Sequence, residues 1–340
     1  MSYSYLKDRL VGMLGAPGLS RLVASSAGAS VVIVMMHRFS RSAGDYPGHD
    51  PVALKRSLSE LRRAGVELVE VEQALDQFVM REERGNAAFS GHPRVAFTVD
   101  DGYADAVEIA GPVFAEFDCP VTCFVAPEIV DGREWYWWDK VDILLRSSPR
   151  SELVIDHEGL RRTLALRTPH DRRITFEEIC ALIKRAPADS VQGILERLAV
   201  AAEAELPVSA PSQFRVLDWN AMLAAEKHGW RFGAHSMTHP VMGQCTDRRA
   251  EWEISESIST VRARLANPSG VFCYPVGGDS DFGDREVEIL RRNGVRWALS
   301  AIPGKLRSLA ATSIHPSWQW RIPRFAHDER PGGMLRMFCS

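Results

Sequence analysis

The sequence predicts an α/β fold organised as a (β/α) barrel or a variant of one. Short runs of aliphatic and β-branched residues alternate with amphipathic segments along most of the 340 residues. This rhythm is typical of parallel sheets whose strands are joined by helices. Polar residues follow several of these runs directly, where the strands would end. Barrels of this type carry their sites at the C-terminal ends of the strands, so the two observations favour one architecture.

The first third of the chain contains strands and helices with clear boundary signals. Ser30–Met35 is largely β-branched, which suits a strand covered on both faces. Asp50 and Pro51 predict the start of a helix, and Gly65 predicts its end. A βαβ unit follows residue 93, with Pro112 as a kink in its helix. The expected elements are strands at 30–35, 66–69, 94–99 and 121–125, and helices at 51–64, 72–84 and 104–117.

The alternation breaks between residues 127 and 212. An aromatic run, Trp135–Trp138, precedes an expected hairpin of strands 153–155 and 163–166 and two charged helices, so we predict an insertion or lid there. The remaining expected elements are helices at 175–185, 189–204, 218–227, 247–265 and 284–292, and strands at 230–233, 271–274, 296–300 and 318–325. The predicted organisation is an N-terminal helical segment at 1–29, a barrel at 30–126 and 213–330, the insertion at 127–212 and a tail at 331–340.

The composition is that of an ordinary globular protein and argues against a nucleic-acid binder. Hydrophobic residues make up 45% of the chain and charged residues 25%. The balance of 41 basic against 44 acidic residues gives a formal charge of −3, which provides no global attraction to nucleic acid or acidic lipid. The six cysteines lack CxxC spacing. We therefore expect buried free thiols rather than a disulfide framework.

The apolar stretches near the N-terminus are short. Residues 27–36 fall below the roughly 20 apolar residues that a membrane span needs. Residues 10–14, interrupted by Gly12, are too short for the apolar core of an export signal. We therefore expect a cytoplasmic protein without a transmembrane segment. An amphipathic helix within Met1 to Ala24 that docks on a surface is the alternative, and would make the protein peripheral to a membrane.

Two consecutive aspartates stand where the strand at 94–99 ends. Adjacent side chains in a strand point to opposite faces, so Asp100 and Asp101 serve one site only if the backbone turns, which Gly102 permits. One carboxylate would then bind a metal while the other takes a proton. The alternative is a plain turn in which Asp is the N-cap of the helix that begins at Ala104.

A histidine pair follows the strand at 230–233. His235 and His239 converge on one metal ion if the intervening residues form a turn of helix, and Ser236 or Thr238 would hold a ring in place by a hydrogen bond. Beside a strand end with two aspartates, the pair predicts an Asp, His, His metal site. Such a site leaves coordination positions open for water and substrate, as in catalytic zinc centres.

These residues resemble the motifs of the polysaccharide deacetylases, the carbohydrate esterases of family 4 with a NodB homology domain. Thr98–Gly102 (TVDDG) is similar to the family's T-F-D-D-G motif, and His235–His239 (HSMTH) to its H-[ST]-x-x-H motif. Phe272–Gly277 (FCYPVG) looks like the third motif. The resemblance runs from about Val31 to Phe325, interrupted by the 127–212 segment. It implies a distorted (β/α)7 barrel, a divalent metal and hydrolysis of an N-acetyl group on an amino sugar.

The resemblance also implies roles for individual residues. Asp101, His235 and His239 would be the metal ligands and Asp100 the general base. Zinc is the first candidate, and Co, Ni, Mn and Fe also suit nitrogen and oxygen ligands. A bound cation polarises the acetyl carbonyl and lowers the pKa of its water, so that Asp100 can take the proton at neutral pH. The developing oxyanion would be held by the metal and by a backbone N–H after the strand at 271–274.

The sequence departs from the family's commonest pattern around the base. Cys273 occupies the position of the Arg that orients it, and Arg321 and Arg324 are candidates to replace that Arg. The family's C-terminal Leu-His motif, whose His is the general acid, is absent after Ser300. A subgroup that looks circularly permuted opens with a Tyr-His segment, which Met36-His37-Arg38 resembles. On that resemblance His37 is the acid, and His327 is the competing candidate.

Several residues are candidates for contact with a sugar. Trp138 and the other aromatic residues of the 135–138 run would form a sugar platform, and anchoring of the insertion to the barrel is an equally good alternative. Tyr274 and Pro275 of the third motif are further candidates for substrate binding. In the helix at 247–265, three glutamates are interpreted as a solvated face: Glu251, Glu253 and Glu256.

The sequence therefore predicts a metal-dependent N-deacetylase that acts on an N-acetylated amino sugar in a glycan or glycan precursor. One alternative is a hydrolase of another amide, such as a cyclic imide or ureide, on the same barrel. The intact Asp, His, His set argues against it. The other alternative is a catalytically silent glycan-binding protein, supported by the altered third motif and the absent C-terminal His.

Overall fold

A curled parallel sheet forms the centre of the protein, as the sequence predicted. The computed structural model describes residues 20, 27–40, 47–84, 91–157, 160–307 and 316–339. The sheet has eight strands in the order β10-β1-β3-β4-β7-β8-β9, with β2 beside β3, and every pairing is parallel. The strands are β1 Val31–Met36, β2 Glu67–Leu68, β3 Arg94–Val99, β4 Val121–Val125, β7 Trp230–Ala234, β8 Val271–Cys273, β9 Trp297–Leu299 and β10 Phe325–Ala326.

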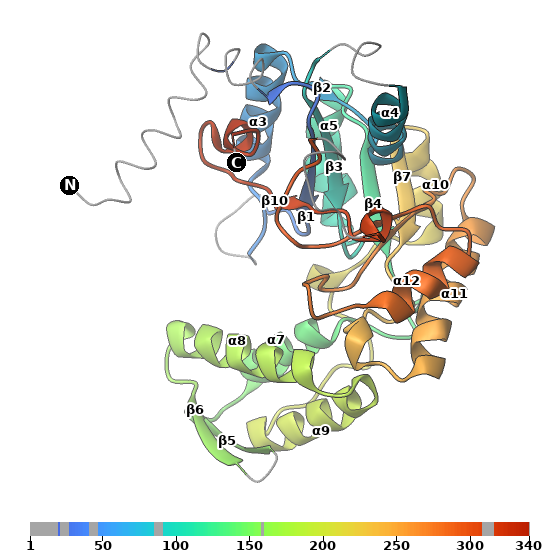
Figure 1. Cartoon of the computed structure of the whole chain (residues 1–340). Coiled ribbons are helices and arrows are strands. Elements are labelled where there is room, and N and C mark those ends of the chain that lie inside the picture. Colours follow the sequence, from blue (N-terminus) through green and yellow to red (C-terminus); the bar gives the residue numbers. More distant parts are fainter. Residues whose placement is uncertain are drawn as a thin grey trace.

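Helices surround this sheet, and their ends follow the predicted signals (Figure 1). The Asp50 side chain accepts a hydrogen bond from the Val52 N–H, and Gly65 ends the helix with a φ of 81°. The predicted kink at Pro112 is confirmed, because a π-helical turn ends one residue before the helix that contains it. The helices are α3 Pro51–Ala64, α4 Val71–Arg84, η1 Ala106–Ala110, α5 Gly111–Glu116, α6 Pro127–Val130, α10 Trp219–Glu226, η4 Met242–Gln244, α11 Asp247–Arg264 and α12 Asp284–Arg292.

The longer strands of the sheet are buried on both faces, whereas β2 and β10 are partly exposed. All six residues of β3 are buried, as expected for a parallel sheet covered by helices. One set of strand residues packs beneath the outer helices, and the other packs inside the barrel against Leu75 and Phe78 of α4. Helix α4 therefore fills one end of the barrel, and a site has room only at the other end.

A short segment between β9 and β10 closes the sheet into a barrel. Ile322 pairs in parallel with Leu299, and its N–H donates to the carbonyl oxygen of Ala298. Three residues later, Phe325 pairs with Val34 of β1. Residues 322–326 thus bridge the gap between the two edge strands. The strand expected at 318–325 is wrong in its extent, because the 3-10 turn η6 (Trp318–Trp320) occupies its first half.

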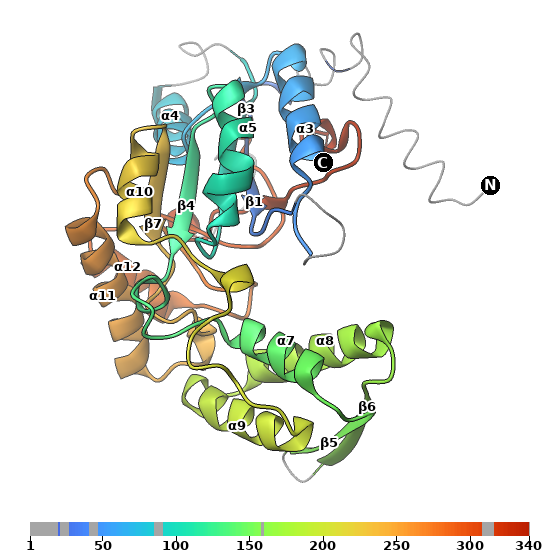
Figure 2. The same ribbon diagram turned by 180° about the vertical axis from the view of Figure 1, so that it is seen from behind.

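Residues 137–202 form a compact group with its own apolar core, which includes Leu144, Leu153, Ile183 and Leu198. Figures 1 and 2 both show this group standing beneath the barrel. Its first helix, α7, was not predicted, because its N-cap residue Tyr136 makes no side-chain cap. Its elements are α7 Trp137–Ser147, β5 Glu152–His157, β6 Leu160–Ala165, α8 Pro169–Arg185, η2 Ala188–Ser190 and α9 Val191–Ala202, and the 3-10 turn η3 Ser212–Phe214 follows the group.

The C-terminal residues pack against the barrel. The last helix, α13 (Gly333–Arg336), buries Met334 and Leu335 in the main core. The residues expected as a tail from 331 therefore contribute to the fold up to the last described position. The helical segment expected at 1–29 lies almost entirely outside the described residues.

None of the helices within the described ranges combines the length and the apolar character needed to cross a membrane.

Candidate active site

A cleft of about 1000 Å³ lies at the C-terminal ends of the strands, between the barrel and the helices α7 and α8. One wall is formed by the residues that follow β1, β3, β7 and β8, and the opposite wall by Leu145 and Phe176 with their neighbours. The structure brings six of the predicted site residues to this cleft: His37, Asp100, Asp101, Trp138, His235 and His239.

The turn after β3 directs its two carboxylates to different partners. Asp101 and Gly102 both have left-handed backbone conformations, with φ values of 74° and 66°. A Cβ on Gly102 would lie 2.7 Å from a methyl group of Val125, so the turn requires glycine at this position. The Tyr136 hydroxyl donates to the main-chain oxygen of Asp101 at 2.6 Å. The alternative in which Asp101 caps the next helix is wrong, because Asp105 occupies the cap position.

The histidine pair converges on Asp101. The Nε2 atoms of His239 and His235 lie 3.4 Å and 3.7 Å from Oδ1 of Asp101. The ring of His235 is held by a 2.7 Å hydrogen bond between Nδ1 and the carbonyl oxygen of Cys273. The expected turn of helix is absent. Instead, Ser236 and His239 have φ values of 62° and 59°, and these left-handed residues fold the chain back so that both rings face one point.

This donor set fits a divalent cation. The ligand atoms of Asp101, His235 and His239 lie within 4.8 Å of one another. Oδ1 of Asp101 is buried and accepts no hydrogen bond, which is costly for a carboxylate unless a cation compensates it. The imidazoles have the form that binds metals, because their pKa values favour the neutral ring.

Burial governs the pKa values at this point of the site. Burial lowers the pKa of His235 to about 4. Burial, followed by the neighbouring His235, lowers the pKa of His239 well below its usual value. Burial also raises the pKa of Asp101 well above its usual value, and the charges of Asp100 and Asp139 raise it further. A cation among these three side chains would lower the pKa of Asp101 and would keep both imidazoles neutral.

Glu253 of α11 supports the turn that carries the histidines. Its carboxylate is fully buried and accepts hydrogen bonds from the N–H groups of Met237 and Thr238 at 2.8 and 2.9 Å. The hydroxyl of Thr238 also donates to it at 2.5 Å. The interpretation of Glu253 as part of a solvated face is therefore wrong. Glu253 lies three residues after the buried Ala250 and four before the buried Ser257, so the helical repeat puts the three residues on one buried face. This spacing was the sequence signal that could have identified Glu253 as buried.

We expect Glu253→Gln to weaken Zn²⁺ binding about 10- to 100-fold, the usual effect of losing a residue that orients metal ligands. The amide cannot accept the same set of hydrogen bonds, so the turn between His235 and His239 would loosen. Isothermal titration with Zn²⁺ measures the change. Glu256→Gln is the matched control, because Glu256 is exposed on the same helix. Equal affinities of the two variants would contradict this role of Glu253.

Asp100 forms a buried ion pair with Arg324. The two carboxylate oxygens accept one hydrogen bond each from Nη1 and Nη2 of the guanidinium, both at 2.8 Å. The side chains are 3% and 1% exposed. Arg324 also donates to the carbonyl oxygen of Ser300, to the Thr98 hydroxyl and to the Cys273 sulfur. The guanidinium thus lies between Asp100 and Cys273, beside the position from which the family's usual Arg is missing.

Arg321, the other candidate for this position, points elsewhere and pairs with Asp284 at 3.0 Å. Around Asp100, burial raises the pKa of the carboxyl, but the charge and hydrogen bonds of Arg324 outweigh it. The pKa of Asp100 is therefore held below its usual range, and the carboxylate is ionised at every pH at which the protein would work.

Of the two candidate acids, only His37 faces the cleft. Its Nε2 atom lies 3.9 Å from Oδ2 of Asp100, and its side chain is 45% exposed. His327 is buried on the other side of β10, where its Nε2 atom is 3.1 Å from the Ser57 hydroxyl of α3. The structure therefore separates His327 from the carboxylates.

The aromatic run divides between the cleft and the core. Trp138 lines the cleft, where its ring stacks on Tyr136 with 4.4 Å between centroids. Trp135 and Tyr136 are buried beneath it and anchor this segment to the barrel. Nε1 of Trp138 donates to the Tyr103 hydroxyl.

Asp139, which directly follows the aromatic run, also lines the cleft. It is buried and accepts a 2.6 Å hydrogen bond from Tyr103. Burial raises the pKa of Asp139 to about 7. This carboxyl is therefore partly protonated near neutral pH, and it can both donate and accept hydrogen bonds.

The structure corrects the placement of Tyr274 and Pro275. The ring of Tyr274 is stacked on Phe282 with 3.8 Å between centroids and is 1% exposed. Pro275 is buried as well. Neither residue lines the cleft, which in this loop is lined by Val276. Val276 has a φ of 60°, so the backbone reverses there and turns the two predicted residues into the core.

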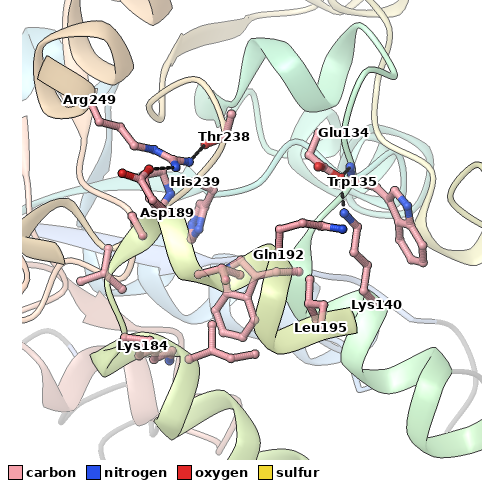
Figure 3. A pocket seen from close by; sticks show the side chains of 17 residues that line it. Glu134, Trp135, Lys140, Lys184, Asp189, Gln192, Leu195, Thr238, His239 and Arg249 are labelled. Atoms are coloured by element: carbon pink, nitrogen blue, oxygen red, sulfur yellow. Dashed lines mark hydrogen bonds and ion pairs between the residues drawn. The ribbon is translucent and has the colours of Figure 1, made fainter. Parts of the chain in front are cut away.

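A smaller pocket of about 170 Å³ lies behind His239, between α9 and the residues that follow the histidine pair. Figure 3 shows Arg249 at its edge, reaching both Asp189 and Thr238. Arg249 is 2.5 Å from Asp189 and 3.3 Å from the Thr238 hydroxyl. The group below the barrel is thereby connected to the turn that carries the two histidines.

Comparisons with known proteins agree with the motifs. Residues 176–298 match the sequence profile of the family described as Polysaccharide deacetylase. The match includes the second and third motifs, whereas Asp100 and Asp101 precede it. No curated protein sequence matches the chain significantly.

Solved structures share the fold at low sequence identity. A Streptococcus pyogenes deacetylase, PplD, has a TM-score of 0.57 and 13% identity, over 92% of this chain and 99% of its own. A Bacillus cereus polysaccharide deacetylase, BC0361, has a TM-score of 0.51 and 13% identity, over 92% and 68%. IcaB from Ammonifex degensii has a TM-score of 0.50 and 16% identity, over 87% and 96%.

Proposed function

We propose that this chain, which matches the Polysaccharide deacetylase profile over residues 176–298 and shares its fold with solved deacetylases, is a metal-dependent hydrolase of N-acetylated amino sugars in a glycan or glycan precursor. The observation that carries the proposal is the convergence of Asp101, His235 and His239 beside the buried carboxylate of Asp100. The cleft of about 1000 Å³ is large enough to hold more than one sugar ring.

Asp101, His235 and His239 would hold the cation, with Zn²⁺ as the first candidate. Three protein ligands leave further positions open, and the bound cation supplies polarisation of the acetyl carbonyl and a more acidic water. The chain prepares this centre through hydrogen bonds behind the ligands. The Cys273 carbonyl sets the ring of His235, and Glu253 sets the turn that carries His239.

Asp100 is the general base in this proposal. The bidentate contact with Arg324 fixes the orientation of its carboxylate and keeps it ionised, so it is ready to accept a proton from the attacking water. Arg324 is a positioning residue, since it contacts Asp100 and not the cleft. Trp138 offers its exposed ring face to a sugar, and Val276 brings the loop after β8 to the cleft, where a main-chain N–H would stabilise the oxyanion.

His37 is the general acid in this proposal. It faces the cleft opposite the metal ligands, and its Nε2 atom is near enough to Asp100 for a substrate amide to lie beside both groups. Loss of the acetyl group leaves an amine that must gain a proton, and imidazole is a usual donor near neutral pH.

We expect His37→Ala to lower kcat about 10²- to 10⁴-fold, the usual contribution of a general acid. The Zn²⁺ content should not change, because His37 is not a ligand. Steady-state acetate release and metal analysis of the same preparation test both statements. His228→Ala is the control, since His228 is exposed and far from the cleft residues. Unchanged kcat in His37→Ala would remove His37 from the mechanism.

The proposed function is tested by acetate release from Zn²⁺-loaded protein. The substrates are N-acetylglucosamine and N-acetylgalactosamine oligomers, a lipid-linked N-acetyl amino sugar and a sugar nucleotide. We expect release from one of them, with loss of activity on chelation and recovery on adding Zn²⁺. Glycan binding without acetate release from any substrate would instead identify a silent binding protein. Turnover of cyclic imides alone would identify a different amidohydrolase.

A further inference from the structure

A second group of metal-ligand side chains lies outside the cleft, at the N-terminal end of α3. His49 precedes the cap residue of α3, while His327 and Glu329 follow β10. Each offers one ligand atom, and these atoms all lie within 4.8 Å of one another. Nδ1 of His49 is 2.8 Å from Oε1 of Glu329, and the two imidazole centroids are 5.2 Å apart. None of the three residues lines the cleft.

His327 contains a buried nitrogen without a partner. The residue is 7% exposed, and its Nδ1 atom is buried with no hydrogen bond. Leaving a buried polar atom unpaired costs about 1–3 kcal/mol. The neighbouring side chains do not compensate it, since Asp328 is engaged by Arg330 and Arg336. Within the described part of the chain this nitrogen has no partner, so a bound cation or a water molecule would remove the cost.

A residue of α3 fixes the orientation of the other ring nitrogen of His327. Its Nε2 atom is 3.1 Å from the hydroxyl of Ser57, a residue that is 1% exposed. When the Ser57 oxygen accepts from Nε2–H, Nδ1 carries a lone pair and is ready to bind a cation. Hydrogen bonds of this kind to the outer nitrogen are usual for metal-binding histidines, because they fix both the ring and its tautomer.

The charge at this group suits one divalent cation. Glu329 contributes a carboxylate, which also faces the N–H of Asp50 at 3.3 Å. Arg56 donates to the main-chain oxygen of Glu329, whose carboxylate faces His49. The side chains of His49 and Glu329 are 23% and 40% exposed, so a cation could enter from solvent and complete its coordination with water.

We propose that His49, His327 and Glu329 form a second divalent-cation site, separate from the candidate active site and suited to Zn²⁺ or a similar ion. Two nitrogen ligands and one carboxylate oxygen are a donor set of borderline softness, which such ions prefer. Ligand atoms around a tetrahedral Zn²⁺ lie about 3.4 Å apart. The present distances therefore require only small side-chain movements.

A cation at this site would join two segments that hold His37. The main-chain N–H of His327 donates to Met35 just before His37, and the N–H of His49 donates to Arg38 just after it. Binding to the folded state alone would stabilise the protein, and the stabilisation would grow with the logarithm of the cation concentration once this exceeds Kd. The role of the site is thus structural, and it does not depend on the proposed function.

The proposal is tested by counting ions in protein from which the first site has been removed. Asp101→Ala is dialysed against Zn²⁺ and then against buffer, and the bound metal is measured by mass spectrometry. We expect about two ions per chain in the wild type and about one in Asp101→Ala. We expect that ion to be lost when His49→Ala or Glu329→Gln is added. His228→Ala, added to the same background, is the control and should retain it.

A second measurement keeps the proposal testable if some of these variants fold poorly. With Co²⁺ in place of Zn²⁺, Asp101→Ala should show a visible absorption band, and Glu329→Gln should shift or abolish it while the circular dichroism spectrum stays unchanged. Zn²⁺ should raise the Tm of Asp101→Ala and not that of Asp101→Ala/His49→Ala. An Asp101→Ala protein that retains no ion, or an ion that the His49 and Glu329 variants retain equally, would overturn the proposal. Acetate release is a separate readout and reports on the first site alone.

Discussion

Asp100→Asn is expected to reduce kcat for acetate release about 10²- to 10⁴-fold while the Zn²⁺ content stays unchanged. The amide has nearly the size of the carboxylate but cannot accept a proton, so the variant removes the proposed base and leaves the three ligands intact. Loss of an interaction made in the transition state lowers kcat and kcat/KM together, whereas a defect in binding would raise KM.

The matched control for this variant is Asp142→Asn. Asp142 also lines the cleft, but it pairs with Arg146 on the outer wall. We expect little change in its kcat. Metal analysis and circular dichroism are carried out on each preparation. They distinguish a variant that has lost only its proposed base from one that has lost the bound metal or the fold. An Asp100→Asn enzyme that keeps about a tenth or more of the wild-type kcat would show that another group takes the proton.

Arg324→Met is expected to lower the free energy of unfolding by about 3–5 kcal/mol, the usual cost of leaving one member of a buried ion pair alone. Asp100 would keep its burial and lose its only guanidinium contact. Urea denaturation at pH 7 measures the change. The double variant Asp100→Asn/Arg324→Met should recover part of the loss, because neither buried charge remains. Equal destabilisation in the single and double variants would contradict this account.

The same variant should change the pH dependence of activity. In the wild type the pKa of Asp100 lies below its usual value, so the ion pair contributes its full stabilisation above about pH 4 and loses it only as the pH falls further. Without Arg324, burial dominates and raises the pKa. We therefore expect the acid limb of kcat/KM to move to higher pH in Arg324→Met, measured with metal-saturated enzyme. Arg324→Lys should show a smaller shift, because an ammonium lacks the bidentate geometry.

The sequence predicted the convergence of the candidate metal ligands better than their surroundings, because these residues are encoded locally. Asp100 and Asp101 directly follow β3, and His235 directly follows β7 with His239 four residues further on. Parallel strands bring these ends together. The backbone conformation of the turn that carries the histidines was predicted less well. Left-handed residues at Ser236 and His239 achieve the convergence that a helical turn was expected to provide, and neither residue type signals that conformation.

The missed features depend on contacts between distant segments. The sequence left two arginines, Arg321 and Arg324, as candidates to orient Asp100. The choice between them depends on how the barrel closes, because Arg324 lies 224 positions after Asp100 in the chain. In the sequence, Glu253 cannot be distinguished from the neighbouring glutamates of α11. Its burial follows only from the packing of α11 against the turn after β7. Tyr274 was assigned to the substrate because it belongs to a motif, but the reversal at Val276 turns its ring into the core.

The closure of the barrel by residues 322–326 has a consequence for how the protein becomes active. The ribosome makes the chain from its N-terminus, so Asp100 emerges long before the guanidinium that orients it. Until the segment with Arg324 inserts between β9 and β1, the barrel has an open seam and the carboxylate has no counter-charge. A chain clipped before this segment would retain Asp101, His235 and His239 but lack an oriented base. Closure of the barrel and orientation of the proposed base thus depend on the same segment.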